Sequence, residues 1–181
     1  MDYPLAAAEQ FTTQGPVLEV REYGQGNVND TFLVTVEGMV GSAHPTSPLD
    51  APGAKRFILQ RLNTRVFPWP QLIMGNLRVF TEHVQARLKR KPLPRRGRRR
   101  DAPRALLTKE GEDHWLGPDG SFWRALTFIE AAQSHGTIEN LEHAREVGWA
   151  LGLFHKLLSD LPPERLADTL PCFHITPGYL R

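Results

Sequence analysis

Gly24-Gln-Gly-Asn-Val-Asn-Asp30 separates two stretches that alternate apolar and polar residues, Val17-Leu-Glu-Val-Arg-Glu-Tyr23 and Thr31-Phe-Leu-Val-Thr-Val-Glu37. This alternation is typical of β-strands with one face buried. Gly and Asn tolerate the positive backbone φ angles that tight turns need. The stretch from 17 to 37 therefore predicts an antiparallel hairpin with a glycine-rich turn.

The remaining segments are strand-like or helix-like by their periodicity. A helix is predicted from Pro70 to about Leu88, because Pro is favoured in a first turn and apolar residues then recur at helical spacing. A longer helix is predicted from about Asn140 to Asp160, and Thr137 or Asn140 can cap it. Three further strands are predicted at 56–61, 104–108 and 122–129, with a polar turn region at 111–120.

The predicted order is three strands, a helix, two strands and a long amphipathic helix. It indicates an α+β fold similar to a protein-kinase-like N-lobe, a five-stranded antiparallel sheet plus one helix, followed by the first helices of a truncated C-lobe. The lobe would cover 1–130, and 131–181 would hold the hinge and the beginning of the incomplete C-lobe. The long helix is apolar over a wide arc, which predicts an exposed patch that favours association.

Positive charge is concentrated in one segment. The formal net charge is +2, yet the segment from Arg87 to Arg104 holds ten Lys or Arg residues and one Asp, while the other 163 residues carry 12 basic and 19 acidic side chains. Dense like charge with Pro and Gly predicts a solvated, mobile loop at 89–103. No aromatic residue is interleaved there, so a specific nucleic-acid partner is not expected.

Composition restricts the class of protein. Apolar residues make up 40% of the chain and charged residues 23%, as in globular domains. No run approaches the roughly 18–20 apolar residues of a membrane span, and the first residues lack the pattern of a secretory signal. The single cysteine, Cys172, cannot form an internal disulfide. We therefore expect a cytoplasmic protein with no membrane partner.

The glycine-rich turn has two interpretations. Small residues let successive backbone N–H groups approach an anion, and kinases use such a hairpin as a lid over ATP phosphates. For the pair Gly24 and Gly26 alone, an ordinary hairpin turn is the better explanation. A Walker-type phosphate loop is excluded, because no Gly-Lys-Ser/Thr follows and the next element is a strand.

Longer strings carry a family resemblance. Gly24-Gln-Gly-Asn-Val-Asn-Asp-Thr-Phe-Leu-Val34 resembles the nucleotide-binding hairpin of the aminoglycoside phosphotransferase and choline kinase superfamily. Phe57-Ile-Leu-Gln-Arg-Leu-Asn-Thr-Arg-Val-Phe67 and Met74-Gly-Asn-Leu77 look more like the N-acetylhexosamine 1-kinase branch. Later stretches fit the same branch in order and spacing, among them Trp123-Arg124, Phe128-Ile129-Glu130 and Gly152-Leu-Phe-His155.

This resemblance implies an ATP-binding site. The backbone of the turn would cover the phosphates, and the candidate residues there are Gly24, Gly26, Asn27, Asn29 and Thr31. The third strand would offer Gln60 or Arg61 to the α and β phosphates, where most kinases have a lysine, and strand alternation puts only one of the two on the nucleotide face. The hinge backbone from Glu130 to Ala132 would pair with the adenine edge, although an ordinary connector explains that position equally well.

The catalytic residues of the resembling family are not found. That family uses a His-Gly-Asp loop, an Asn about five residues later and a further Asp that holds magnesium. Asp160 and Asp168 are the only Asp residues after Ala131, and neither has this context. No catalytic residue, magnesium ligand or paired-His metal site is therefore expected. The simplest interpretation is a truncated or split reading frame.

Three functions are compatible with these observations. The leading one is the ATP-binding portion of a small-molecule, hexosamine-type phosphotransferase, which would bind ATP weakly. A separately encoded C-lobe is its potential partner. Magnesium and a sugar substrate would belong to the complete enzyme. An alternative is a non-catalytic nucleotide-binding or regulatory module that pairs with another chain. A third is a basic nucleic-acid-associated protein that acts through residues 87–104.

Overall fold

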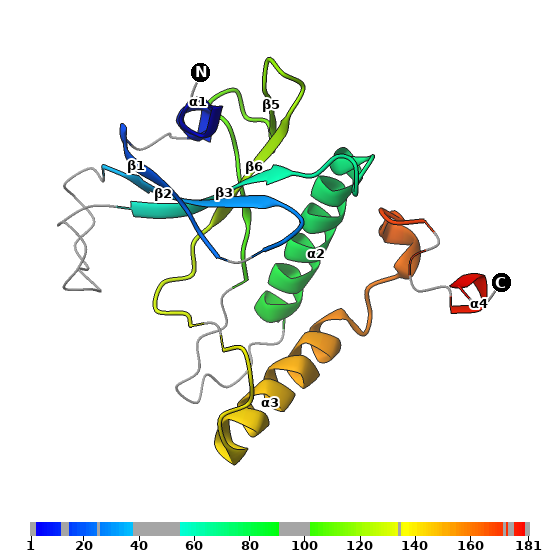
Figure 1. The fold of residues 1–181 in the computed structure, drawn as a ribbon. Helices are drawn as coiled ribbons and strands as arrows, with labels where there is room; N and C mark the ends of the chain where they lie inside the picture. Colours follow the sequence, from blue (N-terminus) through cyan, green and yellow to red (C-terminus); the bar gives the residue numbers. More distant parts are fainter. Residues whose placement is uncertain are drawn as a thin grey trace.

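The computed structural model describes residues 3–11, 15–24, 26–37, 55–90, 102–133, 135–171, 173 and 176–179. They form an α+β fold around an open six-stranded sheet, in which the described strand pairs are antiparallel (Figure 1). The strands lie in the order β1-β2-β3-β6-β4, and β5 also pairs with β6. Their bounds are β1 Val17–Glu22, β2 Asp30–Val36, β3 Lys55–Leu62, β4 Ala105–Leu106, β5 Trp115–Leu116 and β6 Phe122–Thr127.

Helices lie on both sides of this sheet. In Figure 1, α1 lies above the sheet, α2 lies below it, and α3 stands farther away beside one end of α2. A short 3-10 helix and the single turn α4 follow α3. The helix bounds are α1 Tyr3–Phe11, α2 Pro70–Arg90, α3 Leu141–Leu158, the 3-10 helix Pro163–Arg165 and α4 Thr176–Tyr179.

The alternation of side chains along β3 separates the two layers of the core. Phe57 and Leu59 are buried on one face, in a cluster that includes Phe11 of α1. Leu62 is buried on the other face, where it packs against Met74 of α2. Each such side chain contributes about 1.5–3 kcal/mol when it is fully buried. The sheet is therefore held between α1 and α2.

The hairpin and both long helices agree with the sequence prediction. β1 and β2 pair in an antiparallel ladder, and α2 begins at Pro70. The side chain of Asn140 accepts a hydrogen bond of 2.9 Å from the backbone N–H of His143 and so caps α3. Of the two predicted capping residues, Asn140 is the one that acts.

The prediction of five strands and one helix for the first part of the chain was incomplete. It missed α1, because nine residues are too few for an independently stable helix, and α1 is stabilised by burying Ala7, Ala8 and Phe11 against the sheet. It also missed β5, which lies in the predicted polar turn region. Its two residues, Trp115–Leu116, carry no periodic signal and form a strand only by pairing with β6.

Helix α3 has little contact with the sheet and contributes no buried residue to the core. It packs against α2, where the ring centroids of Phe154 and Phe80 are 6.0 Å apart. Beyond its last turn, Asp160 contacts the imidazole of His83 at 2.9 Å. Leu151 remains 54% exposed, so this helix presents the apolar surface that its sequence predicts.

No helix in the described part of the chain combines the length and the apolar character needed to cross a membrane. Most of the basic loop predicted at 89–103, from 91 to 101, lies outside the described residues.

Candidate functional site

Three polar side chains form a row across adjacent strands of the sheet. Thr31 of β2 lies opposite Gln60 of β3, and Gln60 lies opposite Arg124 of β6. Nε2 of Gln60 donates to Oγ1 of Thr31 at 3.1 Å, and Oε1 of Gln60 accepts from Nε and Nη2 of Arg124 at 3.0 and 2.9 Å. The amide of Gln60 therefore holds the guanidinium of Arg124 in a fixed orientation on the sheet.

Arg124 is a partly buried cation with no carboxylate partner among the described residues. Burial lowers the pKa of its guanidinium from the usual value, and no neighbouring acid opposes this shift. A fixed guanidinium in such surroundings is suited to binding an anion such as phosphate. The sequence alone indicates no binding role for Arg124, which stands only in the Trp123-Arg124 stretch of the family resemblance. The signal that identifies it is its register opposite Gln60.

Arg61 lies on the opposite face of β3. Its Nε donates to Oδ2 of Asp30 at 2.6 Å, and its guanidinium carbon lies 5.8 Å from the ring centroid of Trp123. Trp123 belongs to the core cluster on the α1 side of the sheet. Of the two alternatives for the third strand, Gln60 therefore shares its face with Thr31 and Arg124, whereas Arg61 does not.

The turn between β1 and β2 depends on Gly24. Its φ angle is 82°, in the left-handed region that favours glycine. The adjacent backbone N–H of Tyr23 donates to the carbonyl of Thr31 at 2.9 Å and continues the pairing of the hairpin. Gly24 thus has a structural role in the turn.

The far side of the same turn is attached to the end of β3. Oδ1 of Asn29 accepts a hydrogen bond of 3.0 Å from the backbone N–H of Asn63. Asn27 is exposed, and so is Gly26, where an added Cβ would meet nothing closer than the carbonyl oxygen of Asn29 at 3.8 Å. The hydrogen bond to Asn63 therefore gives Asn29 a structural role in the turn, whereas no close contact requires a glycine at position 26.

Aromatic and charged side chains surround the start of the connector between β6 and α3, residues 128–140. The ring of Phe128 meets the ring of Tyr23 edge to face, with 5.9 Å between centroids. The guanidinium carbon of Arg56 lies 4.8 Å from the centroid of Phe128, and the same guanidinium forms an ion pair with Glu130. The carboxylate of Glu130 is therefore attached to β3.

The backbone of the connector is strained immediately after Glu130. Ala131 has a φ of 54°, in the left-handed region, which costs an L-residue about 1–2 kcal/mol. Within the described part of the chain, no backbone–backbone hydrogen bond involves the peptide groups of Ala131 or Ala132. Ala132 is an exposed residue, so its N–H and C=O groups are candidates for binding a ligand.

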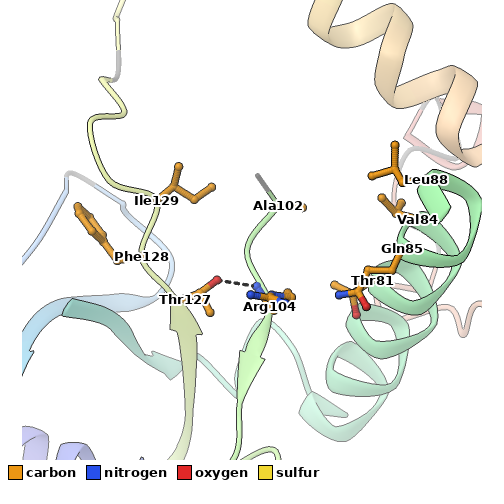
Figure 2. A pocket seen from close by; sticks show the side chains of 9 residues that line it. All are labelled: Thr81, Val84, Gln85, Leu88, Ala102, Arg104, Thr127, Phe128 and Ile129. Atoms are coloured by element: carbon orange, nitrogen blue, oxygen red, sulfur yellow. Dashed lines mark hydrogen bonds between the residues drawn. The ribbon is translucent and has the colours of Figure 1, made fainter. Parts of the chain in front are cut away.

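A pocket of about 320 Å³ lies between this connector and α2 (Figure 2). Its size is at the lower end of the range for small-molecule pockets, about 300–1,000 Å³. On the sheet side, the backbone N–H of Arg104 donates to Oγ1 of Thr127 at 3.0 Å. Phe128 and Ile129 line the pocket next to Thr127, and the other lining residues are Thr81, Val84, Gln85, Leu88 and Ala102.

The row and the connector offer hydrogen-bond donors and a cation, whereas the nearby carboxylates are already paired. Asp30 pairs with Arg61, and Glu130 pairs with Arg56. The arrangement can therefore bind an anion, and its described residues present no unpaired carboxylate for base catalysis. No protein-family model matches this sequence.

Proposed function

We propose that this chain is the ATP-binding portion of a small-molecule phosphotransferase of the hexosamine-kinase type, which its sequence motifs resemble. In this proposal residues 1–130 act as a protein-kinase-like N-lobe, and residues 131–181 hold the hinge and the beginning of a second lobe. Support comes from the antiparallel sheet, the glycine-containing turn at the β1–β2 edge, and the long helix α2 on the face opposite α1.

The observation that carries the proposal is the contact of Gln60 with Arg124. Kinases place a cation on the third strand to bind the α and β phosphates. Here the third strand has a neutral amide on that face, and the guanidinium of the adjacent strand lies within hydrogen-bond distance of it. Arg124 would supply the charge, while Gln60 and Thr31 would orient it and donate to phosphate oxygens.

The connector after β6 would bind the base. A purine presents one donor and one acceptor along the edge that kinase hinges recognise. The N–H and C=O groups of Ala132, which form no backbone–backbone hydrogen bond in the described part of the chain, match that requirement. Phe128 and Ile129 offer apolar surface beside them. Glu130 would act through its backbone, because its carboxylate is already paired with Arg56.

The proposal concerns nucleotide binding rather than phosphoryl transfer. Transfer needs a carboxylate that orients the acceptor hydroxyl and further carboxylate and amide ligands for magnesium. Asp30 and Glu130 are the acids beside the row and the connector, and both are held by arginines. Magnesium would arrive with the nucleotide, and the described residues of this site would contact the phosphates and the base.

A displacement assay tests the proposal on the full chain. A fluorescent ATP analogue is titrated first, and unlabelled ATP, adenosine and inorganic triphosphate then compete with it. We expect weak binding in which ATP competes better than either fragment, because base and phosphate subsites both contribute. Failure of the analogue to bind at millimolar concentration would contradict the proposal, and so would competition by triphosphate as strong as that by ATP.

A further inference from the structure

Three potential metal ligands converge where the connector meets α3. His135 and Glu139 belong to the connector, and His143 lies in the first turn of the helix. Nδ1 of His135 lies 2.7 Å from Oε1 of Glu139, and the rings of His135 and His143 meet edge to face with 4.6 Å between centroids. One ligand atom from each of the three residues lies within 4.8 Å of the other two.

The ligand types favour a zinc-class cation. Two imidazoles and a carboxylate are typical ligands of Zn²⁺, which binds nitrogen and oxygen at about 2.0–2.2 Å and prefers tetrahedral geometry. Bond lengths of this size put neighbouring ligand atoms about 3.4 Å apart. The three side chains therefore need to move by about an ångström to coordinate the ion. His135 and Glu139 are free to do so by rotating their side chains, because they are exposed and are not packed in the core.

The local backbone presents these side chains together. The Asn140 cap fixes the start of α3, since its Oδ1 accepts from the backbone N–H of His143. The backbone N–H of Glu139 also points at Nδ1 of His143, at a distance of 3.3 Å. This bond is long for N–H···N geometry, so exchanging it for coordination to a metal loses little. Three protein ligands leave a fourth tetrahedral position for water.

We propose that His135, Glu139 and His143 form a binding site for a divalent zinc-class cation, which fastens the connector to the first turn of α3. The site does not depend on the proposed nucleotide function, because it shares no residue with the row of Thr31, Gln60 and Arg124. Metal binding here stabilises the one segment that joins the sheet to α3.

The test is a zinc titration of the full chain without a polyhistidine tag, in competition with a chromophoric chelator. We expect one tightly bound zinc per chain. His135→Gln, Glu139→Gln and His143→Gln should each weaken zinc binding by about tenfold or more. Substituting a residue that only hydrogen-bonds to a metal ligand typically weakens metal binding by roughly 10–100-fold, and the loss of a ligand itself should cost at least as much. His155→Gln is the matched control, since His155 is an exposed histidine of the same helix outside the cluster.

Cobalt provides a second readout on the same proteins. Co²⁺ in a tetrahedral site gives intense visible absorption, which should be present in the wild type and in His155→Gln and absent in the three cluster variants. Equal zinc affinity in the wild type and in His135→Gln would overturn the proposal. It would also be overturned if His155→Gln weakened binding as much as the cluster variants, because binding would then reflect scattered surface histidines.

Discussion

Oε1 of Gln60 lies 2.9 Å from Nη2 of Arg124 and 3.0 Å from Nε, so one amide oxygen on β3 accepts both hydrogen bonds from a guanidinium on β6. The opposite end of the same amide donates to Thr31 on β2. Three neighbouring strands are thereby linked through side chains on one face of the sheet. Under the proposed function, the positive charge that a third-strand lysine supplies in kinases would come from Arg124 on the adjacent strand β6.

Substitution of Gly24 by alanine should destabilise the hairpin. At a φ of 82°, alanine destabilises the folded state by about 1–2 kcal/mol relative to glycine. Part of this cost is offset because alanine also reduces the conformational entropy of the unfolded chain. We expect a net loss of about 1 kcal/mol in the free energy of unfolding, measured by urea denaturation. The space around Gly24 is open, so a steric clash would not explain the loss.

Gly75→Ala is the matched control for that experiment. Gly75 lies within α2, and a Cβ added there also meets nothing within 4 Å. Because its backbone is helical, alanine should stabilise the chain by about 1 kcal/mol. Equal effects of the two substitutions would contradict the assignment of Gly24 to a left-handed turn.

The pair of Arg78 and Asp113 should make stability depend on pH below neutrality. Nη2 of Arg78 lies 2.6 Å from Oδ2 of Asp113, and His114 contacts the same carboxylate. Burial tends to raise the pKa of Asp113, but hydrogen bonds from His114 and Arg78 outweigh burial and hold this pKa below its usual value. The ionised carboxylate is therefore favoured in the folded chain.

A carboxyl group whose folded pKa is depressed stabilises the fold above its unfolded pKa, about 3.9, and loses this contribution as the pH falls through the folded pKa. Asp113→Asn should reduce the free energy of unfolding by about 0.5–1 kcal/mol at pH 7, a modest value because solvent screens the exposed Arg78. The difference from wild type should shrink in urea denaturation near pH 3. A difference that stays constant between these pH values would contradict this account.

The exposed face of α3 should drive self-association. Val147 and Leu151 lie one turn apart and are 47% and 54% exposed. Contiguous apolar surface of this kind favours association in water. Leu151→Glu should shift sedimentation velocity profiles towards the monomer. Arg145→Glu, an exposed position on another side of the helix, should leave the wild-type distribution unchanged, and an equal shift from both substitutions would indicate a general effect of charge.

Local patterns predicted the elements that form from their own residues. The β1–β2 hairpin has a glycine turn between alternating strands, and the start of α2 and the cap of α3 are marked by Pro70 and Asn140. By contrast, α1 and β5 depend on contacts with the sheet, so their short sequences give no sufficient signal. Strand pairing also ends β6 at Thr127, two residues before the predicted end.

The sequence predicted only part of the candidate site. Alternation along the third strand left Gln60 and Arg61 as alternatives, and the pairing with β2 and β6 separates them by face. Arg124 is 64 residues away from Gln60 in sequence, and only the register of the sheet brings the two together. Likewise, His135 and Glu139 lie in an irregular connector, where residue spacing does not predict proximity to His143.

The most direct measurement is the affinity for ATP of Arg124→Gln compared with Arg61→Gln, using the fluorescent displacement assay. The two arginines lie on opposite faces of the same sheet. Loss of a charged hydrogen bond, worth about 1.5–3 kcal/mol, should weaken ATP binding by about tenfold or more in Arg124→Gln and leave adenosine binding unchanged. Arg124→Lys should recover part of the affinity, and thermal melting checks that each variant folds.

We predict that Arg61→Gln binds ATP as the wild type does, because Arg61 faces Trp123 and Asp30. If Arg124→Gln is folded and retains wild-type affinity for ATP, Arg124 does not bind the phosphates, and the central claim is wrong. The same conclusion follows if both substitutions weaken ATP binding equally.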